Sequence, residues 1–206
     1  GLGEPIGALT ASLTGWLQGM REGSIVILAI IMGLMLAFDM GGPVNKVAYA
    51  FMLICVSQGV YSVVAIAAVG IAVPPLGMGL ATLIGRKYFS AEERETGKAA
   101  LVMGCVGVTE GAIPFAAADP LRVIPANMIG AATGCVTAAL LGAQCYAGWG
   151  GLIVLPVVEG KGGFVAGLAV GAIVSAACVI LLKALAKKKT SDAKADDEMD
   201  LDFEIN

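Results

Sequence analysis

Two carboxylates set in strongly apolar surroundings have the clearest chemical potential in this sequence. Glu110 and Asp119 lie in the segment 107–120, which reads GVTEGAIPFAAADP and also holds two prolines. A charged side chain that faces lipid at the centre of a membrane helix costs about 2.5–3.5 kcal/mol. A membrane protein therefore retains such groups only where they face one another, a water-filled cavity or a ligand.

A second apolar region is interrupted in the same way. The segment 38–46, FDMGGPVNK, combines Asp39, Asn45 and Lys46 with a Gly-Gly-Pro break. Irregular backbone at membrane depth survives only where it is packed in protein or lines a polar cavity. Broken helices of this kind form the midplane sites of secondary transporters. Together the two interruptions predict a translocation site near the middle of the membrane.

The chemistry of such a site favours a polyol over a bare ion. Hydrogen bonds from hydroxyl groups to a carboxylate such as Glu110 are roughly twice as strong as neutral ones, and Asn45 and the free backbone groups of a broken helix add donors. Glu110 lies too deep to reach the interface and has no basic residue within helical reach. The chain has no histidine, which excludes imidazole metal sites and histidine acid–base chemistry. We expect neither a metal nor a cofactor.

Several of these residues also have simpler structural explanations. Asp119 followed by Pro120 is typical of a helix start. Arg122 can pair with Asp119 three residues away or extend to a membrane interface. Asn45 fits a helix cap as well as a ligand contact, and Lys46 could lie nearer an interface than the midplane.

The composition places the chain among polytopic α-helical membrane proteins. Of its 206 residues, 58% are hydrophobic and 14% charged, with a mean hydropathy of +0.87. Soluble domains have about 45–50% apolar and about 25% charged residues. The five cysteines lack the C-x-x-C spacing of metal or redox sites, so we expect them to be small buried hydrophobic residues.

The apolar stretches predict an all-α fold of transmembrane helices with discontinuous or re-entrant segments. Three glycines at four-residue spacing in the last stretch, Gly163, Gly167 and Gly171, predict close packing on another helix. The stretches are 24–38, 47–69, 73–85, 99–108, 123–141 and 164–182.

The longest internal polar loop contains a helix start. Ser90 followed three residues later by Glu93 fits a capping box, which predicts a helix from about Ala91 that enters the membrane after Lys98. Glu110 is twelve positions beyond Lys98, which corresponds to roughly 18 Å at the rise of an α-helix. That depth is near the middle of a hydrocarbon core about 30 Å thick.

Basic residues in the polar loop 86–98 and at the end of the last apolar stretch place both in the cytoplasm. An even number of crossings must separate them: four, or two with re-entrant hairpins. We expect a polar or interfacial segment 1–23, a membrane-embedded transport domain 24–186 and a disordered cytoplasmic tail 187–206. The start shows no signal-peptide pattern and reads as a cut or processed end, so we expect the chain to be part of something longer.

The two interrupted segments resemble the signature segments of a known family. FDMGGPVNKVAYAF (38–51) and GVTEGAIPFAAADPLRVIP (107–125) are similar to fructose-family permease domains, the enzyme IIC components of the bacterial phosphotransferase system. The similarity extends through GIAVPPLGMGLATLI to the last helix. It implies a multi-pass sugar permease of the inner membrane, whose transport domain has re-entrant hairpins and moves against a dimerising scaffold. A complete permease domain of this family is longer, so we expect the C-terminal transport half.

The resemblance also implies partners. In the family, a phosphocysteine on enzyme IIB phosphorylates the sugar at the cytoplasmic side, and the phosphate comes from phosphoenolpyruvate through a phosphocarrier protein and enzyme IIA. This chain has no phosphoacceptor-like cysteine, so any enzymatic activity requires the partner. We expect a sugar substrate, a phosphorylated IIB domain, the lipid bilayer and a homodimer, and no nucleic acid. The loop 86–98 is a candidate docking surface for IIB and equally a solvated loop.

The resemblance extends to particular site residues. The segment Gly-Val-Thr-Glu that ends at Glu110 is similar to the sugar-contacting glutamate motif of related glucose-type permeases, which implies that Glu110 and Thr109 contact the sugar. Related branches place a histidine near the sugar, a position that Asp39, Asn45 or Lys46 would take here. The predicted substrate-binding set is Glu110, Asp39, Asn45, Lys46, Thr109 and Asp119.

Two other functions remain open. An ion-coupled secondary transporter would bind Na⁺ or H⁺ at Asp39 and Glu110. A non-transporting membrane scaffold or sensor is disfavoured because it has no use for carboxylates at the midplane. Fructose, a fructose-like ketose and a mannosyl-glycerate-type glycoside are all compatible with the motifs.

Overall fold

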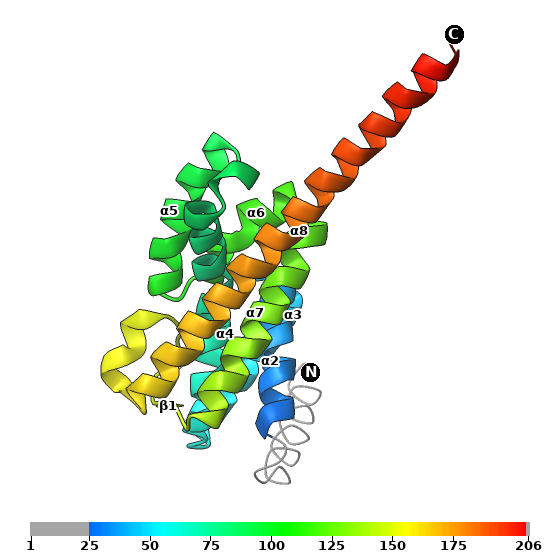
Figure 1. Ribbon diagram of the computed structural model, residues 1–206. Coiled ribbons are helices and arrows are strands. Elements are labelled where there is room, and N and C mark those ends of the chain that lie inside the picture. Colours follow the sequence, from blue (N-terminus) through cyan, green and yellow to red (C-terminus); the bar gives the residue numbers. More distant parts are fainter. Residues whose placement is uncertain (1–24, 205–206) are drawn as a thin grey trace, which may run out of the picture.

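The computed structural model describes residues 25–204, with side chains as far as Lys187, and nearly all of this part is helical (Figure 1). The segment predicted to be interfacial, 1–23, lies outside the described residues. The elements in chain order are α2 (Ile25–Phe38), α3 (Pro43–Ser57), α4 (Tyr61–Ile84), η1 (Arg86–Tyr88), α5 (Ala91–Cys105), η2 (Thr109–Ala112), α6 (Ile113–Ala118), α7 (Pro120–Leu140), β1 (Gln144–Cys145), η3 (Leu152–Val157), β2 (Val158–Glu159) and α8 (Lys161–Glu204).

Three of the described helices are long and apolar enough to cross a membrane: α4, α7 and the part of α8 from Lys161 to Lys187. In α4, 89% of the most apolar window is buried within the protein, against 44% in α7 and 39% in α8. A helix that is apolar all round and enclosed on all sides forms the centre of a bundle. The predicted all-α membrane fold is confirmed.

The boundary between α3 and α4 differs from the prediction. The apolar stretches 47–69 and 73–85 were expected to be separate, but α4 runs through Pro74 and Pro75 without interruption. The break lies earlier, where α3 ends and Gly59 adopts a left-handed φ of +73°. Proline is tolerated inside a membrane helix because neighbouring groups satisfy the freed backbone.

Small residues bring α7 and α8 close together. A Cβ atom added to Gly134 would lie 2.7 Å from the carbonyl oxygen of Gly167, and one added to Gly130 would lie 2.7 Å from that of Gly171. Any larger side chain at these positions would force the helices apart. The packing role predicted for the glycines of the last stretch is confirmed at Gly167 and Gly171.

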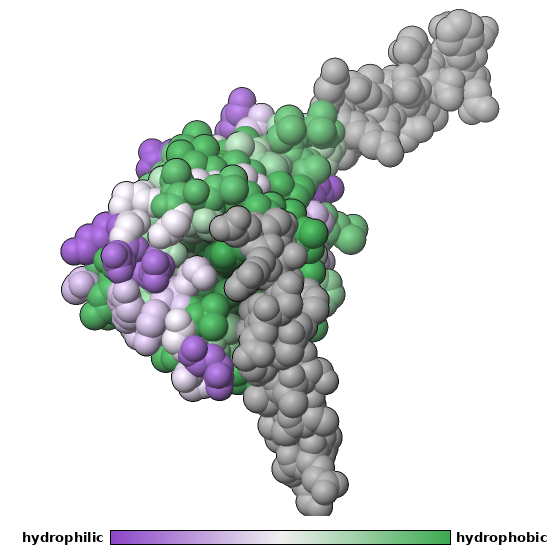
Figure 2. All heavy atoms as spheres, turned by 90° about the horizontal axis from the view of Figure 1, so that it is seen from below, coloured by the Kyte–Doolittle hydropathy of each residue, from purple (hydrophilic) through white to green (hydrophobic). Residues whose placement is uncertain are grey.

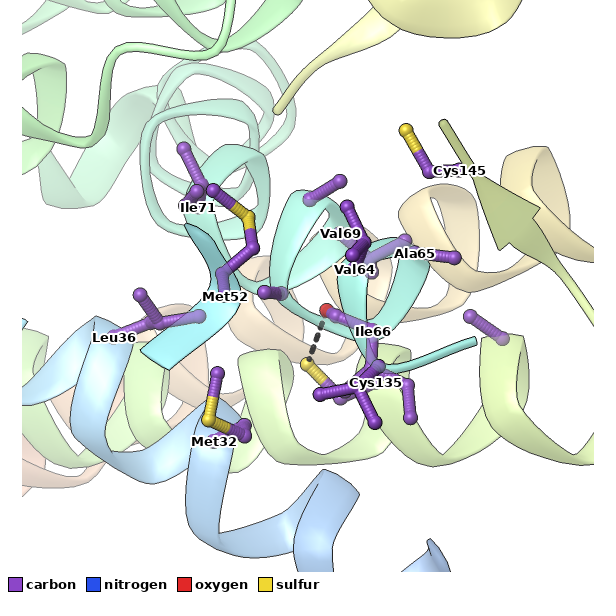
Figure 3. Close-up of a cluster of buried hydrophobic side chains, with 14 of the residues drawn as sticks. Met32, Leu36, Met52, Val64, Ala65, Ile66, Val69, Ile71, Cys135 and Cys145 are labelled. Carbon is purple, nitrogen blue, oxygen red and sulfur yellow. Dashed lines mark hydrogen bonds between the residues drawn. The ribbon is translucent and has the colours of Figure 1, made fainter. Parts of the chain in front are cut away.

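The core surrounds the first half of α4, as Figure 3 shows. Cys135 of α7 is fully buried, and its thiol donates to the carbonyl oxygen of Ile66 at 3.2 Å. All five cysteines are free, and Cys55, Cys135 and Cys145 are buried. These three pack as small buried hydrophobic residues, as predicted, whereas Cys105 and Cys178 are half-buried.

The pair formed by α5 and η2–α6 is a re-entrant hairpin. Glu93 at the start of α5, Asp119 at the end of α6 and Lys183 near the end of the apolar part of α8 line one cavity. The chain therefore returns to the end of the bundle from which α5 began. Between the polar loop and Lys183 only α7 and α8 run the length of the bundle, so this part of the chain has two crossing-length helices and one hairpin.

The pair α2–α3 forms a second hairpin, which enters from the opposite end. Gly33 of α2 packs on Ala132 of α7, and Met40 just after α2 contacts Asn127 nearer the start of α7, so the two helices are antiparallel. The next helix, α3, returns toward the loop that joins α7 to α8, where the Tyr49 hydroxyl of α3 donates to a backbone carbonyl at 3.0 Å. The tips of the two hairpins therefore point toward each other.

The two segments predicted to be cytoplasmic, the loop 86–98 and the C-terminal tail, both contain helical structure. The capping box is present: the Ser90 hydroxyl accepts from the Glu93 N–H at 3.1 Å, and the Glu93 carboxylate accepts from the Ser90 N–H at 2.7 Å. The segment predicted to be a disordered tail differs, because α8 continues to Glu204 (Figure 1). Extending an existing helix avoids the unfavourable nucleation step, which the composition-based expectation did not consider.

The outside of the bundle is largely apolar. Figure 2, which views the molecule from below, shows hydrophilic residues gathered on one side and apolar residues over much of the rest. Leu121 and Leu140 of α7 are 85% and 68% exposed, and Ile84 of α4 is 69% exposed. Exposed apolar residues on helices of spanning length are typical of a lipid-facing surface, and the chain is a membrane protein.

Candidate functional site

The tips of the two hairpins meet beside Ile71, which lies near the middle of α4. A cavity of about 220 Å³ separates them. Its walls come from the α2–α3 tip, the segment before and within η2, α4 and the loop before η3. The lining residues are Gly41, Asn45, Lys46, Tyr49, Ile71, Gly107, Thr109, Glu110 and Trp149.

Glu110 links the two tips directly. Gly41 has a φ of +110°, and a Cβ atom added there would lie 2.8 Å from Oε1 of Glu110. Only glycine adopts this backbone conformation without strain, and only glycine leaves room for the carboxylate. Among the described residues Glu110 forms no ion pair, so its carboxylate remains able to accept hydrogen bonds in the cavity.

The first turn of α3 supplies two further predicted residues. Asn45 is 7% exposed, and its Nδ2 donates to the carbonyl oxygen of Leu36 at 2.6 Å. This bond fixes the amide and leaves its oxygen as the group that can accept from a ligand. Lys46 is exposed and brings a cation to the cavity. From the other tip, Thr109 is buried, and its hydroxyl donates to the Ile71 carbonyl oxygen at 3.0 Å.

Asp39 lies beside the site without lining it. Its Oδ2 accepts from the backbone N–H of Val44 at 2.7 Å, and its Oδ1 accepts from that of Asn45 at 2.9 Å. A carboxylate at this position satisfies free N–H groups of the first turn of α3 and interacts favourably with the helix dipole. Asp39 therefore orients the turn that carries Asn45 and Lys46.

Asp119 lies in a different place from the other predicted residues. It lines a cavity of about 580 Å³ at the end of the bundle, because α6 carries the chain away from the hairpin tip. Both of its carboxylate oxygens accept from Nη1 of Arg122 at 2.9 Å. The i,i+3 pair considered from the sequence is present, and α7 begins at Pro120 as expected. The Asp119 side chain makes no capping hydrogen bond to α7.

The sequence analysis missed an aromatic pair in the cavity wall. The Tyr49 and Trp149 rings lie 6.3 Å apart in an edge-to-face arrangement. Tyr49 donates to the carbonyl oxygen of Gly148 at 3.0 Å, and Trp149 Nε1–H donates to that of Val106 at 2.7 Å. Tyr49 follows Asn45 by four residues, a spacing that puts both on one helix face. For Trp149, a hundred residues away from Tyr49, the sequence offers no comparable signal.

The arrangement combines a free carboxylate, an amine, fixed amide and hydroxyl oxygens, and an apolar aromatic wall. A small ligand with several hydroxyl groups and an apolar face matches these features, since orienting polar groups in a mostly apolar pocket give specificity. Among the described residues no cluster of three or more His, Cys, Asp or Glu side chains could hold a metal ion.

Comparison with known proteins identifies close relatives. The fructose-like permease IIC component 2 of Escherichia coli (strain K12) is 80% identical over 207 residues, covering 100% of this chain and 58% of that protein. The PTS system fructose-specific EIIC component of Haloferax volcanii is 38% identical over 197 residues, covering 95% of this chain and 52% of that protein. The PTS system fructose-specific EIIB'BC component of Xanthomonas campestris is 46% identical over 184 residues, covering 88% of this chain and 32% of that protein.

This chain spans about half the length of the permease components it matches, and about a third of a relative with an EIIB'BC name. No family model and no solved structure matches it. The matched region includes both hairpin tips and all the residues of the cavity, because the alignment with the Escherichia coli relative covers the whole chain. With 80% identity along its full length, this chain belongs to the fructose-type IIC permease family of the sugar phosphotransferase system.

Proposed function

We propose that this chain forms the sugar-binding part of a permease that carries fructose or a fructose-like sugar across the bacterial inner membrane. A partner IIB domain phosphorylates the sugar as it arrives. The observation that carries the proposal is the position of the Glu110 carboxylate. It lies where two opposed hairpins meet, beside the middle of α4, a helix of membrane-spanning length. A carboxylate is retained at such a depth where it binds a polar ligand.

The polar groups of the cavity divide the recognition of a sugar between them. The Glu110 carboxylate accepts hydrogen bonds from sugar hydroxyl groups, and Lys46 donates to sugar oxygens. The amide oxygen of Asn45 and the hydroxyl oxygen of Thr109 accept further bonds, because the Thr109 hydroxyl and one of the two Asn45 amide N–H groups already donate to backbone carbonyl oxygens. Each of these groups comes from one of the two tips, so a bound sugar bridges both hairpins.

The aromatic pair provides the apolar side of the site. The polar tips of Tyr49 and Trp149 are occupied by backbone carbonyl oxygens, so these residues present ring surface to the cavity. A sugar ring has an apolar C–H face that packs well on an aromatic ring, which has a negatively polarised face. The cavity of about 220 Å³ is smaller than the roughly 300–1,000 Å³ of pockets for drug-sized ligands. A single sugar ring fits this size better than an extended glycoside.

The end of the bundle that carries the loop 86–98 faces the cytoplasm in this proposal. The Glu93 carboxylate pairs with Lys183 of α8 at 2.9 Å, so the polar loop and the lysine-rich end of α8 lie together, as the positive-inside rule requires for one side. The loop is the candidate surface for the phosphorylated IIB domain, which receives phosphate through IIA and the phosphocarrier protein. Relatives named as EIIB'BC and EIIABC components support these partners. A homodimer completes the proposed assembly.

Replacing Glu110 with Gln in the full-length permease tests the proposal. We expect Glu110→Gln to abolish phosphoenolpyruvate-dependent sugar phosphorylation by membranes that contain the partner proteins, while the amount of permease in the membrane stays normal. Glu159→Gln is the matched control, because Glu159 is an exposed carboxylate of β2 that lies outside both the cavity and the loop 86–98. Normal phosphorylation by Glu110→Gln would refute the proposal, and accumulation of unmodified sugar by the wild type would indicate an ion-coupled transporter instead.

A further inference from the structure

A buried amide lies behind the hairpin tip that contacts Glu110. Asn127 of α7 is fully buried. Its Oδ1 accepts from the Ser175 hydroxyl of α8 at 2.7 Å, and its Nδ2 donates to the thioether sulfur of Met40 at 3.6 Å. A thioether is a weak acceptor. The amide is thus costly to bury and gains little from the bond to Met40, so that contact calls for an explanation.

The Ser175 hydroxyl, which orients the Asn127 amide, lies in a space left by glycines of two neighbouring helices. Ser175 is fully buried. A Cβ atom added to Gly77 of α4 would lie 2.5 Å from its Oγ, and one added to Gly130 of α7 would lie 2.5 Å from its Cβ. Glycines on two helices therefore make the space for this serine. Since a polar group in an apolar interior is destabilising unless it is hydrogen-bonded, Ser175 holds the Asn127 side chain in one orientation.

The other end of the amide holds a strained piece of backbone. Met40 has a φ of +42° and is the single non-glycine residue with positive φ among those that the structure describes. This conformation is unfavourable for a side chain such as Met and persists only where the surroundings impose it. The Met40 side chain is 2% exposed, and the Asn127 amide anchors its sulfur. Ser175, Asn127 and Met40 thus connect α8 to the tip of the α2–α3 hairpin.

The strained residue directly precedes the glycine beneath the Glu110 carboxylate. Gly41 lies close enough that an added Cβ would be 2.8 Å from Oε1 of Glu110. A change in the backbone dihedral angles of Met40 would rotate Gly41 and move the backbone that contacts this carboxylate. The position of the Glu110 carboxylate therefore depends on hydrogen bonds that run from Ser175 of α8 through Asn127 of α7 to Met40.

We propose that Asn127 is a positioning residue for the sugar site, acting on Glu110 through Met40 and Gly41. The inference rests on the proposed function, since it assigns Asn127 a role in the affinity of that site for sugar. Asn127 itself does not line the cavity. Its amide keeps the hairpin tip in the one backbone conformation that leaves the Glu110 carboxylate free to accept from a ligand.

The test replaces Asn127 with Leu, an apolar residue of similar size, in the full-length permease reconstituted in liposomes. We expect fructose or the transported sugar to bind about tenfold more weakly, the equivalent of one lost hydrogen bond, while the maximal rate of phosphorylation changes less. Thr82→Val is the matched control, because Thr82 is a buried hydroxyl of α4 whose bond to the Gly79 carbonyl stays within its own helix. Its sugar affinity should equal that of the wild type.

Hydrogen exchange gives a second readout that needs no sugar. Asn127→Leu should speed exchange of the backbone N–H groups of Gly42 and residues 44–46, where Asp39 caps α3, and leave exchange in α5 unchanged. If the wild type binds no sugar, the proposed function fails, but this comparison still decides whether Asn127 holds the tip. Equal acceleration throughout the bundle would mean that Asn127 only stabilises the fold, and would overturn the proposal.

Ser175→Ala by itself covers the case in which Asn127→Leu does not fold, and a double-mutant comparison serves the case in which it does fold. Ser175→Ala removes the bond that orients the amide and leaves Asn127 in place, so it should weaken sugar binding less than Asn127→Leu and in the same direction. Because the two residues act in one chain, adding Ser175→Ala to Asn127→Leu should weaken binding no further. Fully additive effects, or sugar affinity unchanged in both single variants, would contradict the proposal.

Discussion

Replacing Gly41 with Ala is the most direct perturbation of the contact between the two hairpin tips. The added methyl group would lie 2.8 Å from Oε1 of Glu110, in a position that no rotation of the Ala side chain can change. Gly41 also has a φ of +110°, which an L-residue adopts only with strain. The substitution therefore acts on the site through two separate effects, whose sizes can be compared.

The backbone effect costs about 1–3 kcal/mol, the range for a residue forced into a sparsely populated conformation. The steric effect requires the carboxylate oxygen to move from 2.8 Å to an ordinary contact distance of at least 3.4 Å, a displacement of about 0.6 Å. Because this displacement weakens hydrogen bonds between sugar hydroxyl groups and a charged carboxylate, each worth about 1.5–3 kcal/mol, we expect sugar affinity to fall by about ten- to a hundredfold.

Quenching of Trp149 fluorescence by the sugar provides the assay, because Trp149 lines the cavity. Trp16 is the other tryptophan of the chain and is replaced by Phe in the background used for all variants. Gly59→Ala is the matched control: Gly59 has a φ of +73°, and an added Cβ would meet nothing within 4 Å. It reproduces backbone strain without touching Glu110.

We expect Gly59→Ala to lower thermal stability and leave sugar affinity unchanged, and Gly41→Ala to lower both. If Gly41→Ala bound sugar as tightly as the wild type, Glu110 would not depend on the opposite tip for its position. If both variants lost affinity equally, strain alone would explain the loss. Either result would refute the reasoning that links the two hairpins.

Three further outcomes follow from the structure. Asp39→Ala should destabilise the start of α3 by about 1 kcal/mol, the typical value for a lost cap, and Asp39→Asn less; faster hydrogen exchange confined to the first turn of α3 would show it. Gly134→Val should prevent the close approach to Gly167 and cost about 1–3 kcal/mol or more through overpacking, visible as a lower melting temperature in detergent. Ser90→Ala should fray the start of α5 at a cost of about 1 kcal/mol without changing sugar affinity, and a loss of affinity would show that this end of α5 contributes to the site.

Local rules predicted much of the fold because they depend on neighbours in sequence. The capping box at Ser90 and Glu93 was predicted from two residues three positions apart and is present. The close packing at Gly167 and Gly171 followed from four-residue spacing and was also confirmed. The break between α3 and α4 was misplaced: the expected boundary fell between 69 and 73, whereas α4 continues through Pro74 and Pro75. Inside a buried helix, neighbouring groups satisfy the backbone that proline leaves free.

By itself, the sequence determined the class of the protein and the two places where a polar site could exist, since burying charge and irregular backbone in lipid is costly wherever the chain folds. Only the tertiary structure decided which residues share the site. It brought Glu110 against Gly41, turned the Asp39 carboxylate toward α3, and separated Asp119 from the cavity. It also added Tyr49 and Trp149. These outcomes depend on how opposed hairpins approach each other, and that approach is set by packing between segments distant in the chain.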